Sequence, residues 1–124
     1  MAELVELLVI ARDERTVTAL CAALEQQGIA IDVARSTAQA RDLFLDRGGH
    51  RLLVVGPDVG QGMAQQVLNA LRSADPQLPV VVFGPGCFRS NPPDGLTRIP
   101  DFHPSSRAGI GALLRILRGL SPIR

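Results

Sequence analysis

Runs of consecutive apolar residues alternate along the chain with segments in which apolar residues recur every three or four positions. The runs Val5–Ala11, Leu52–Val55 and Val80–Phe83 are rich in β-branched residues, a composition typical of strands that are covered on both faces. A short alternating pattern at residues 29–33 predicts another strand, and Leu96–Ile99 predicts a short final one. The pattern therefore predicts five strands.

Helices are predicted between these strands from the same spacing. The first spans Glu14–Gln27 and ends at Gly28, and the second runs from a cap at Ser36 or Thr37 to Arg47 and ends at Gly48-Gly49. A third presents Met63, Val67, Ala70 and Leu71 on one side and is closed by Asp75-Pro76; a last one, capped by Ser105 or Ser106, buries Ile110, Leu113, Leu114 and Leu117.

The segment between the fourth and fifth predicted strands differs from the other connections. Residues 84–95 contain three glycines and three prolines, a composition that disfavours a full helix. Alternating strands and helices predict a parallel sheet with helices on both faces. We therefore predict a single domain over residues 1–124, a flavodoxin-like (βα)₅ fold with strand order 2-1-3-4-5, whose fourth helix is short or replaced by a loop.

Composition limits the function classes. The 124 residues are 46% hydrophobic and 20% charged, as expected for one globular domain. No apolar run has a membrane-spanning length and the N-terminus lacks a basic leader, so a cytoplasmic location is expected. All 13 basic residues are arginine, which excludes any mechanism that needs a lysine. The net charge of +1 gives no general case for nucleic-acid or membrane binding, although residues 89–124 are locally basic.

The cysteines and histidines suggest no site. Cys21 and Cys87 are 66 residues apart, without the spacing of a zinc site or a disulfide framework, so reduced thiols are expected. Cys21 lies on the apolar face of the first helix and is expected in the core, whereas Cys87 lies in the irregular loop and is expected to be exposed. His50 and His103 have no partner at ligand spacing and are interpreted as surface residues. We predict neither a metal nor a cofactor.

Ligands of open α/β sheets bind at the carboxyl ends of the strands. The loops at those ends read Ala11-Arg12-Asp13, Gly56-Pro57-Asp58, Gly84-Pro85 and Ile99-Pro100. With these loops and the helix-ending Gly28, nearly the whole chain resembles a bacterial response-regulator receiver (CheY-like) domain of two-component systems. That family has an acidic pair after strand one, a phosphoacceptor Asp after strand three, a Ser or Thr after strand four and a Lys-Pro after strand five.

Aligned by strand ends, the resemblance implies a degenerate phosphorylation pocket. The acidic pair falls on Ala11 and Arg12 and the phosphoacceptor on Gly56. The Ser/Thr position falls on Gly84, and Ile99 precedes Pro100 where the family has its lysine; the resemblance implies that the bond before Pro100 is cis.

Loss of these groups removes the phosphorylation chemistry. The reaction needs a carboxylate nucleophile, a divalent cation held by oxygen ligands and a positive group. The charge of Arg12 would repel magnesium or take its place. The alternative is that Asp13 and Asp58 replace the lost carboxylates after a register slip, but loop aspartates such as Asp58 are usually turn formers.

These observations predict a non-catalytic pseudo-receiver that acts through protein contacts. The resemblance extends to the degenerate N-terminal receivers of enhancer-binding transcription activators, and implies a homodimer through strand four, strand five and the last helix. Arg107, Arg115 and Arg118 lie off the apolar stripe of that helix and are candidates for this surface. The alternative function is an anion- or nucleotide second-messenger sensor that uses Arg12 and the glycine-lined loops. DNA binding by the basic last helix is disfavoured.

Overall fold

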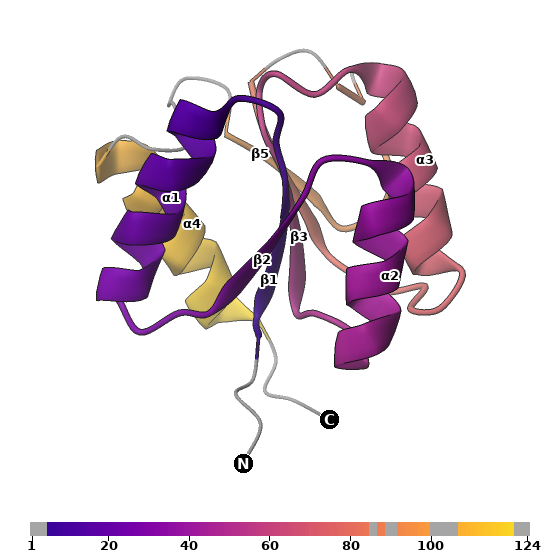
Figure 1. The fold of residues 1–124 in the computed structure, drawn as a ribbon, viewed down its shortest axis with the longest axis horizontal. Coiled ribbons are helices and arrows are strands. Elements are labelled where there is room, and N and C mark those ends of the chain that lie inside the picture. The colour runs from indigo at the N-terminus through magenta and orange to yellow at the C-terminus, as the bar shows by residue number, and fades with distance from the viewer. Residues whose placement is uncertain (1–4, 85–86, 89–91, 100–106, 121–124) are drawn as a thin grey trace.

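A computed structural model describes residues 5–84, 87–88, 92–99 and 107–120. Its strands are β1 (Leu7–Ile10), β2 (Ile31–Ala34), β3 (Leu52–Val55), β4 (Val80–Phe83) and β5 (Leu96–Ile99). Its helices are α1 (Glu14–Gln26), α2 (Thr37–Arg47), α3 (Gln61–Arg72) and α4 (Arg107–Gly119). Figure 1 shows the sheet between two layers of helices, with α1 and α4 on one face and α2 and α3 on the other.

All five strands are parallel, and their order is β2-β1-β3-β4-β5. In the centre of the sheet, Leu7 of β1 pairs with Ile31 of β2 on one side and with Leu52 of β3 on the other. The predicted strand order and fold class are confirmed. The carboxyl ends of β1, β3 and β4 consequently meet at one edge of the sheet.

The helix boundaries follow from local capping. Ser36 is the N-cap of α2 and its hydroxyl accepts a hydrogen bond from the Gln39 amide at 3.1 Å. The same helix ends at Gly48, whose φ of 74° is left-handed. Gly28, with φ of 75°, follows α1 in the same way, so both predicted stop signals are confirmed. The predicted caps Ser105 and Ser106 lie outside the described residues.

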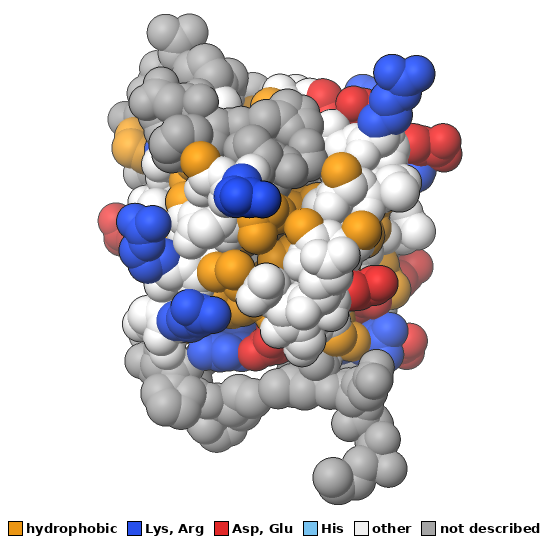
Figure 2. Space-filling model, turned by 90° about the vertical axis from the view of Figure 1, so that its left-hand side faces the viewer, with side chains coloured by type: hydrophobic (Ala, Val, Ile, Leu, Met, Phe, Trp, Pro, Cys, Tyr) orange, Lys and Arg blue, Asp and Glu red, His pale blue; other side chains and the backbone are white. Residues whose placement is uncertain are grey.

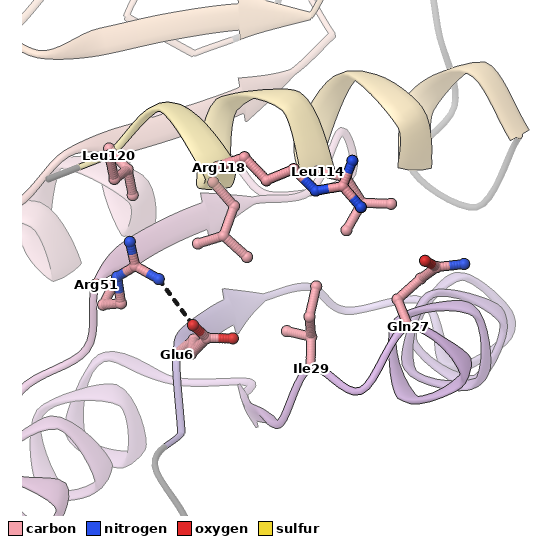
Figure 3. Close-up of a pocket in the computed structure, with 8 residues that line it drawn as sticks. Glu6, Gln27, Ile29, Arg51, Leu114, Arg118 and Leu120 are labelled. Carbon is pink, nitrogen blue, oxygen red and sulfur yellow. Dashed lines mark hydrogen bonds and ion pairs between the residues drawn. The ribbon is translucent and has the colours of Figure 1, made fainter. Parts of the chain in front are cut away.

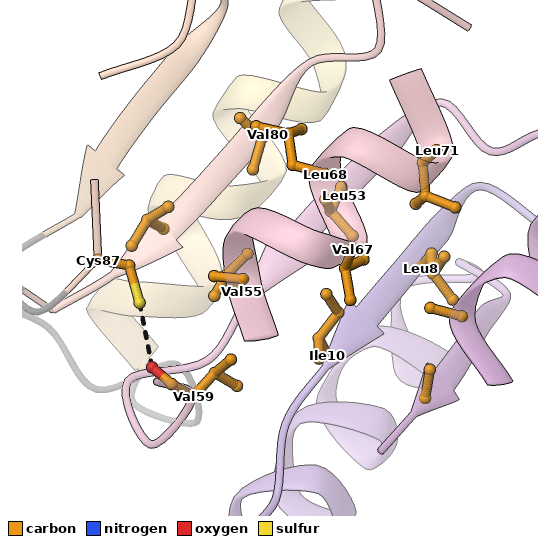
Figure 4. Packing of buried hydrophobic residues seen from close by; sticks show 14 of the residues in the cluster. Leu8, Ile10, Leu53, Val55, Val59, Val67, Leu68, Leu71, Val80 and Cys87 are labelled. Atoms are coloured by element: carbon orange, nitrogen blue, oxygen red, sulfur yellow. Dashed lines mark hydrogen bonds between the residues drawn. The ribbon is translucent and has the colours of Figure 1, made fainter. Parts of the chain in front are cut away.

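The core is divided in two by the sheet. Every residue of β1, β3 and β4 is buried, and alternate side chains point to opposite faces. Leu8, Val55 and Val80 pack against Val67 and Leu71 of α3 (Figure 4). On the other face, residues of α1 and α4 such as Leu20, Leu24, Leu113 and Leu117 cover Val9, Val54 and Val81.

The described part of the connection between β4 and β5 contains no helix, and two side chains fill the space instead. Cys87 and Phe88 are 3% and 2% exposed and belong to the core on the α3 side. The Cys87 thiol donates a hydrogen bond to the Val59 carbonyl at 3.0 Å (Figure 4). The expectation that Cys87 is exposed was therefore wrong. Burial raises the pKa of this thiol, although nearby Arg98 opposes the effect.

Arg98 of β5 binds the backbone of this segment through its guanidinium group. Its guanidinium donates to the carbonyl oxygens of Gly84 at 2.8 Å, Cys87 at 2.6 Å and Phe88 at 3.1 Å. The fork of donors on an arginine suits several acceptors at fixed positions. Backbone groups that a helix would satisfy internally are satisfied here by one side chain. Cys21, expected in the core, is only half-buried on α1.

His50 lies in a buried polar cluster, so its interpretation as a surface residue was wrong. Its side chain is 0% exposed and its Nε2 lies 2.8 Å from Oδ2 of Asp32. Arg47 donates two hydrogen bonds to the same carboxylate, at 3.0 and 3.1 Å, and the His50 ring stacks on Phe44 with centroids 5.6 Å apart. Nδ1 of His50 is buried without a hydrogen-bond partner in the part of the chain that the structure describes.

The pKa values of His50 and Asp32 are both lowered in this cluster. Burial lowers the pKa of His50, more than the Asp32 carboxylate raises it. Burial alone would raise the pKa of Asp32, but hydrogen bonds from Arg47 and His50 outweigh it and hold that pKa below its ordinary value. His50 is thus neutral in the native state at pH 7.

We expect the native state to lose stability as the pH falls below the ordinary histidine value of 6.5, because the unfolded chain takes up a proton that buried His50 resists. His50 can lower the free energy of unfolding by at most about 1.4 kcal/mol for each pH unit below 6.5. Well above pH 6.5 its contribution to the free energy of unfolding is constant. Urea unfolding between pH 8 and pH 5 measures it, and this range stays above the ordinary aspartate pKa of 3.8. His50→Gln should flatten the profile; an unchanged slope in this variant would contradict the assignment.

Candidate functional site

The loops after β1, β3 and β4 converge at the carboxyl edge of the sheet, where parallel α/β folds place their ligands. The Gly56 amide donates to the Ile10 carbonyl at 2.8 Å, and the Ala11 amide donates to the Ala34 carbonyl at 3.4 Å. Ala11 is 1% exposed, whereas Arg12 is exposed. Residues predicted from strand ends alone are thus brought together here.

Asp58 links two of these loops. Its Oδ2 accepts hydrogen bonds from the backbone amides of Arg12 at 2.9 Å and Asp13 at 2.5 Å. The turn that carries it is closed by a hydrogen bond from the Val59 amide to the Gly56 carbonyl at 3.3 Å. Two consecutive amides aimed at one oxygen form an anion-binding concavity, and the carboxylate of Asp58 fills it.

Gly56 lies directly beneath this carboxylate. A Cβ atom on Gly56 would lie 3.1 Å from Oδ1 of Asp58, 3.2 Å from the Ile10 oxygen and 3.3 Å from Cβ of Ala11. Each distance is shorter than an ordinary van der Waals contact. The space that a side chain at position 56 would enter is therefore occupied by Asp58, Ile10 and Ala11.

Asp13 has a structural role at the start of α1. It is the N-cap, its Oδ1 accepts from the Arg15 amide at 3.1 Å, and its Oδ2 accepts from the Thr16 hydroxyl at 3.0 Å. Thr16 is buried. The two aspartates considered as replacements for lost carboxylates thus both bind backbone amides.

The remaining predicted positions are Gly84, Ile99 and Pro100. Gly84 has φ of 87°, and a Cβ there would lie 3.3 Å from Cβ of Pro57, so a larger residue would be strained by its backbone and by its neighbour. Ile99 is 5% exposed and packs into the core on the α4 side. Pro100, with its predicted cis bond, lies outside the described residues.

Other functional candidates are dispersed. Within the described ranges, no three His, Cys, Asp or Glu side chains are grouped so that they could hold a metal ion. Arg107, Arg115 and Arg118 are exposed on α4, as the helical pattern predicts. No helix among the described residues is long and apolar enough to cross a membrane.

Sequence patterns missed the role of Arg98. Arg98 is two positions after Leu96, and side chains two positions apart in a strand point to the same face. Arg98 therefore lies on the face of β5 whose Leu96 packs against the core. An arginine at an inward strand position is a signal that buried carbonyl oxygens need donors.

Comparison with solved structures supports the fold. A response regulator receiver protein from Sinorhizobium medicae WSM419 is 18% identical, with a TM-score of 0.70 over 94% of this chain and 97% of that one. The receiver domain of the hybrid histidine kinase CckA is 14% identical, with a TM-score of 0.69 over 90% and 97% of the two chains.

The likeness extends beyond natural receivers. A de novo designed Rossmann 2x3 fold protein is 10% identical, with a TM-score of 0.63 over 96% of this chain and 94% of the design. No protein-family model and no curated protein matches the sequence. Because the matched structures are so distant in sequence, they establish the architecture, and the function must be argued from the residues of this chain.

We expect Gly56→Ala to destabilise the protein by about 1–3 kcal/mol, since its Cβ would overpack the site. Asp58→Ala removes one of the three close atoms, so the double variant should lose less stability than the sum of the single variants. Urea unfolding of the four proteins gives the coupling. Gly62→Ala is the matched control, because a Cβ there meets nothing within 4 Å and should stabilise α3 by about 1 kcal/mol. Additive single effects would contradict the packing argument.

Proposed function

We propose that this chain is a regulatory module of receiver fold that does not accept a phosphoryl group and acts through protein contacts in two-component signalling. The observation that carries the proposal is the site over Gly56. At this site the backbone amides of Arg12 and Asp13 both donate to the Asp58 carboxylate. The same carboxylate lies in the space that a side chain at position 56 would enter. The role we propose is regulatory rather than catalytic, as is general for domains of receiver fold.

Phosphorylation of an aspartate requires an oxygen nucleophile free to attack, a cation bound by oxygen ligands, and stabilisation of the transferred charge. Asp58 offers the only carboxylate on the loop after β3, and attack through Oδ2 would break its two hydrogen bonds to Arg12 and Asp13. The exposed Arg12 adds a fixed positive charge where a divalent cation would need to bind. These costs favour a permanent structural role for Asp58.

An anion or nucleotide sensor is the second candidate for this edge of the sheet. The amides of Arg12 and Asp13 are suitable donors for a phosphate oxygen. They already bind Asp58 at 2.9 and 2.5 Å, so an anionic ligand would have to displace an internal carboxylate at high effective concentration. The occupied amides therefore favour the protein-contact proposal.

The contact surface we propose lies around β4, β5 and α4, and its partner is a second copy of the chain. Because every residue of β4 is buried, β5 and α4 provide its exposed part. β5 is an edge strand, paired on one side only with β4, and edge strands offer unpaired backbone groups. On α4, Ala112 and Ile116 are half-buried and lie one turn apart, with Arg115 exposed beside them. An apolar strip with a charged border has the composition of an interface. That the chain is the N-terminal domain of an enhancer-binding transcription activator stays a prediction from the resemblance.

Incubation with acetyl phosphate and magnesium should leave the mass of the intact protein unchanged, because the Asp58 carboxylate is held by the backbone amides of Arg12 and Asp13 and the charge of Arg12 opposes the binding of a divalent cation. Mass spectrometry gives the result, with a receiver domain that retains its acidic residues treated in parallel as the positive control. A stable phosphoryl adduct that disappears in Asp58→Asn would overturn the proposal.

Sedimentation velocity should show a reversible dimer that Ala112→Glu converts to a monomer, because the substitution buries a charge in the proposed interface. Ala38→Glu is the matched control, since Ala38 is exposed on α2 on the other face of the sheet; it should remain dimeric. Thermal unfolding verifies that both variants fold. A wild-type protein that stays monomeric at high concentration, or an Ala112→Glu dimer, refutes this surface.

A further inference from the structure

A pocket of about 570 Å³ lies at the opposite end of the sheet from the candidate site. Its walls come from the start of β1, the loop between α1 and β2, the residue before β3 and the C-terminal half of α4. This volume is within the range of small-molecule sites. In Figure 3, Ile29 points into the space beneath α4, between the Glu6–Arg51 pair and the side chains of Gln27 and Arg118.

The floor and one wall are aliphatic. Ile29 and Leu117 are 9% and 4% exposed, and Leu114 and Leu120 are half-buried at the side. Figure 2 shows that apolar side chains also gather in the middle of the face that the pocket adjoins, with basic side chains around them. None of the described residues that line the pocket is aromatic, so they offer no surface for stacking a base or another flat ring.

The charged side chains at the rim of the pocket determine which charged group a ligand can place there. Glu6 and Arg51 form an ion pair at 2.8 Å and are each 23% exposed in their side chains. Arg118 has no hydrogen bond or ion pair with the described residues, and it is exposed beside Leu114. Two arginines and one glutamate leave the rim with one net positive charge. A single negative charge is matched by Arg118, whereas a polyphosphate would also meet the Glu6 carboxylate.

We propose that this pocket binds a small amphipathic monocarboxylate, with its carboxylate on Arg118 and its aliphatic chain over Ile29, Leu114 and Leu117. The Gln27 amide is close enough in the lining to serve as a second donor. The guanidinium fork of Arg118 can bind a carboxylate through two parallel hydrogen bonds. The inference is independent of the proposed loss of phosphorylation, because the pocket lies at the amino ends of the strands and shares no residue with the loops around Gly56.

Octanoate is the probe, titrated into the ¹⁵N-labelled full chain and followed by amide chemical shifts. A ligand of this size that fits should saturate with Kd of about 1 mM. Shifts should centre on Gln27, Ile29, Leu114 and Arg118. Octanol has the same number of carbon atoms as octanoate but no charge, and it should bind roughly 10-fold more weakly. Acetate, which has the charge alone, should not saturate.

Arg118→Gln should weaken octanoate binding about 10-fold, whereas the matched control Arg41→Gln, exposed on α2 on the other face of the sheet, should leave Kd unchanged. Leu114→Gln should weaken octanoate and octanol alike. The proposal fails if octanoate shifts do not saturate, if they centre elsewhere, or if the two arginine variants behave identically. None of these outcomes bears on phosphorylation.

Discussion

Burial of three neighbouring strands on both faces governs the rest of this structure. β1, β3 and β4 expose no residue, so a shift of any of them by one residue would exchange the side chains of the two cores. The pairing of Leu7 with both Ile31 and Leu52 is therefore fixed. Fixed register sets where each strand ends, and hence which loop residues meet. The contact of Asp58 with the loop after β1 depends on this alignment.

Most of the fold could be predicted from local patterns because its elements carry local signals. The β3 and β4 boundaries match the apolar runs, and Ser36, Gly28 and Gly48 mark helix ends through capping and left-handed backbone. Local patterns failed where a residue's environment depends on partners distant in sequence. His50 is buried because Asp32 and Phe44 lie beside it in space, and Cys87 because Phe88 and Arg98 draw its loop over the core.

The site could be located from the sequence but its internal arrangement could not. Strand ends placed Ala11, Gly56 and Gly84 at one edge, since parallel strands end together. The hydrogen bonds of Asp58 join residues 45 and 46 positions apart, and no sequence spacing encodes such a contact. The same edge is therefore closed by its own side chain, while an aliphatic pocket with one unmatched arginine is open at the other end of the sheet.

The two glycines at the closed edge limit which residues these positions can accept. An aspartate at position 56 would meet the Asp58 carboxylate, the Ile10 oxygen and Ala11 at once. A serine at position 84 would inherit a left-handed backbone and press on Pro57. Either substitution is therefore expected to cost stability, because the neighbouring atoms must shift to admit a Cβ. These two positions are thus less open to change than Gly62, where an added Cβ meets nothing within 4 Å.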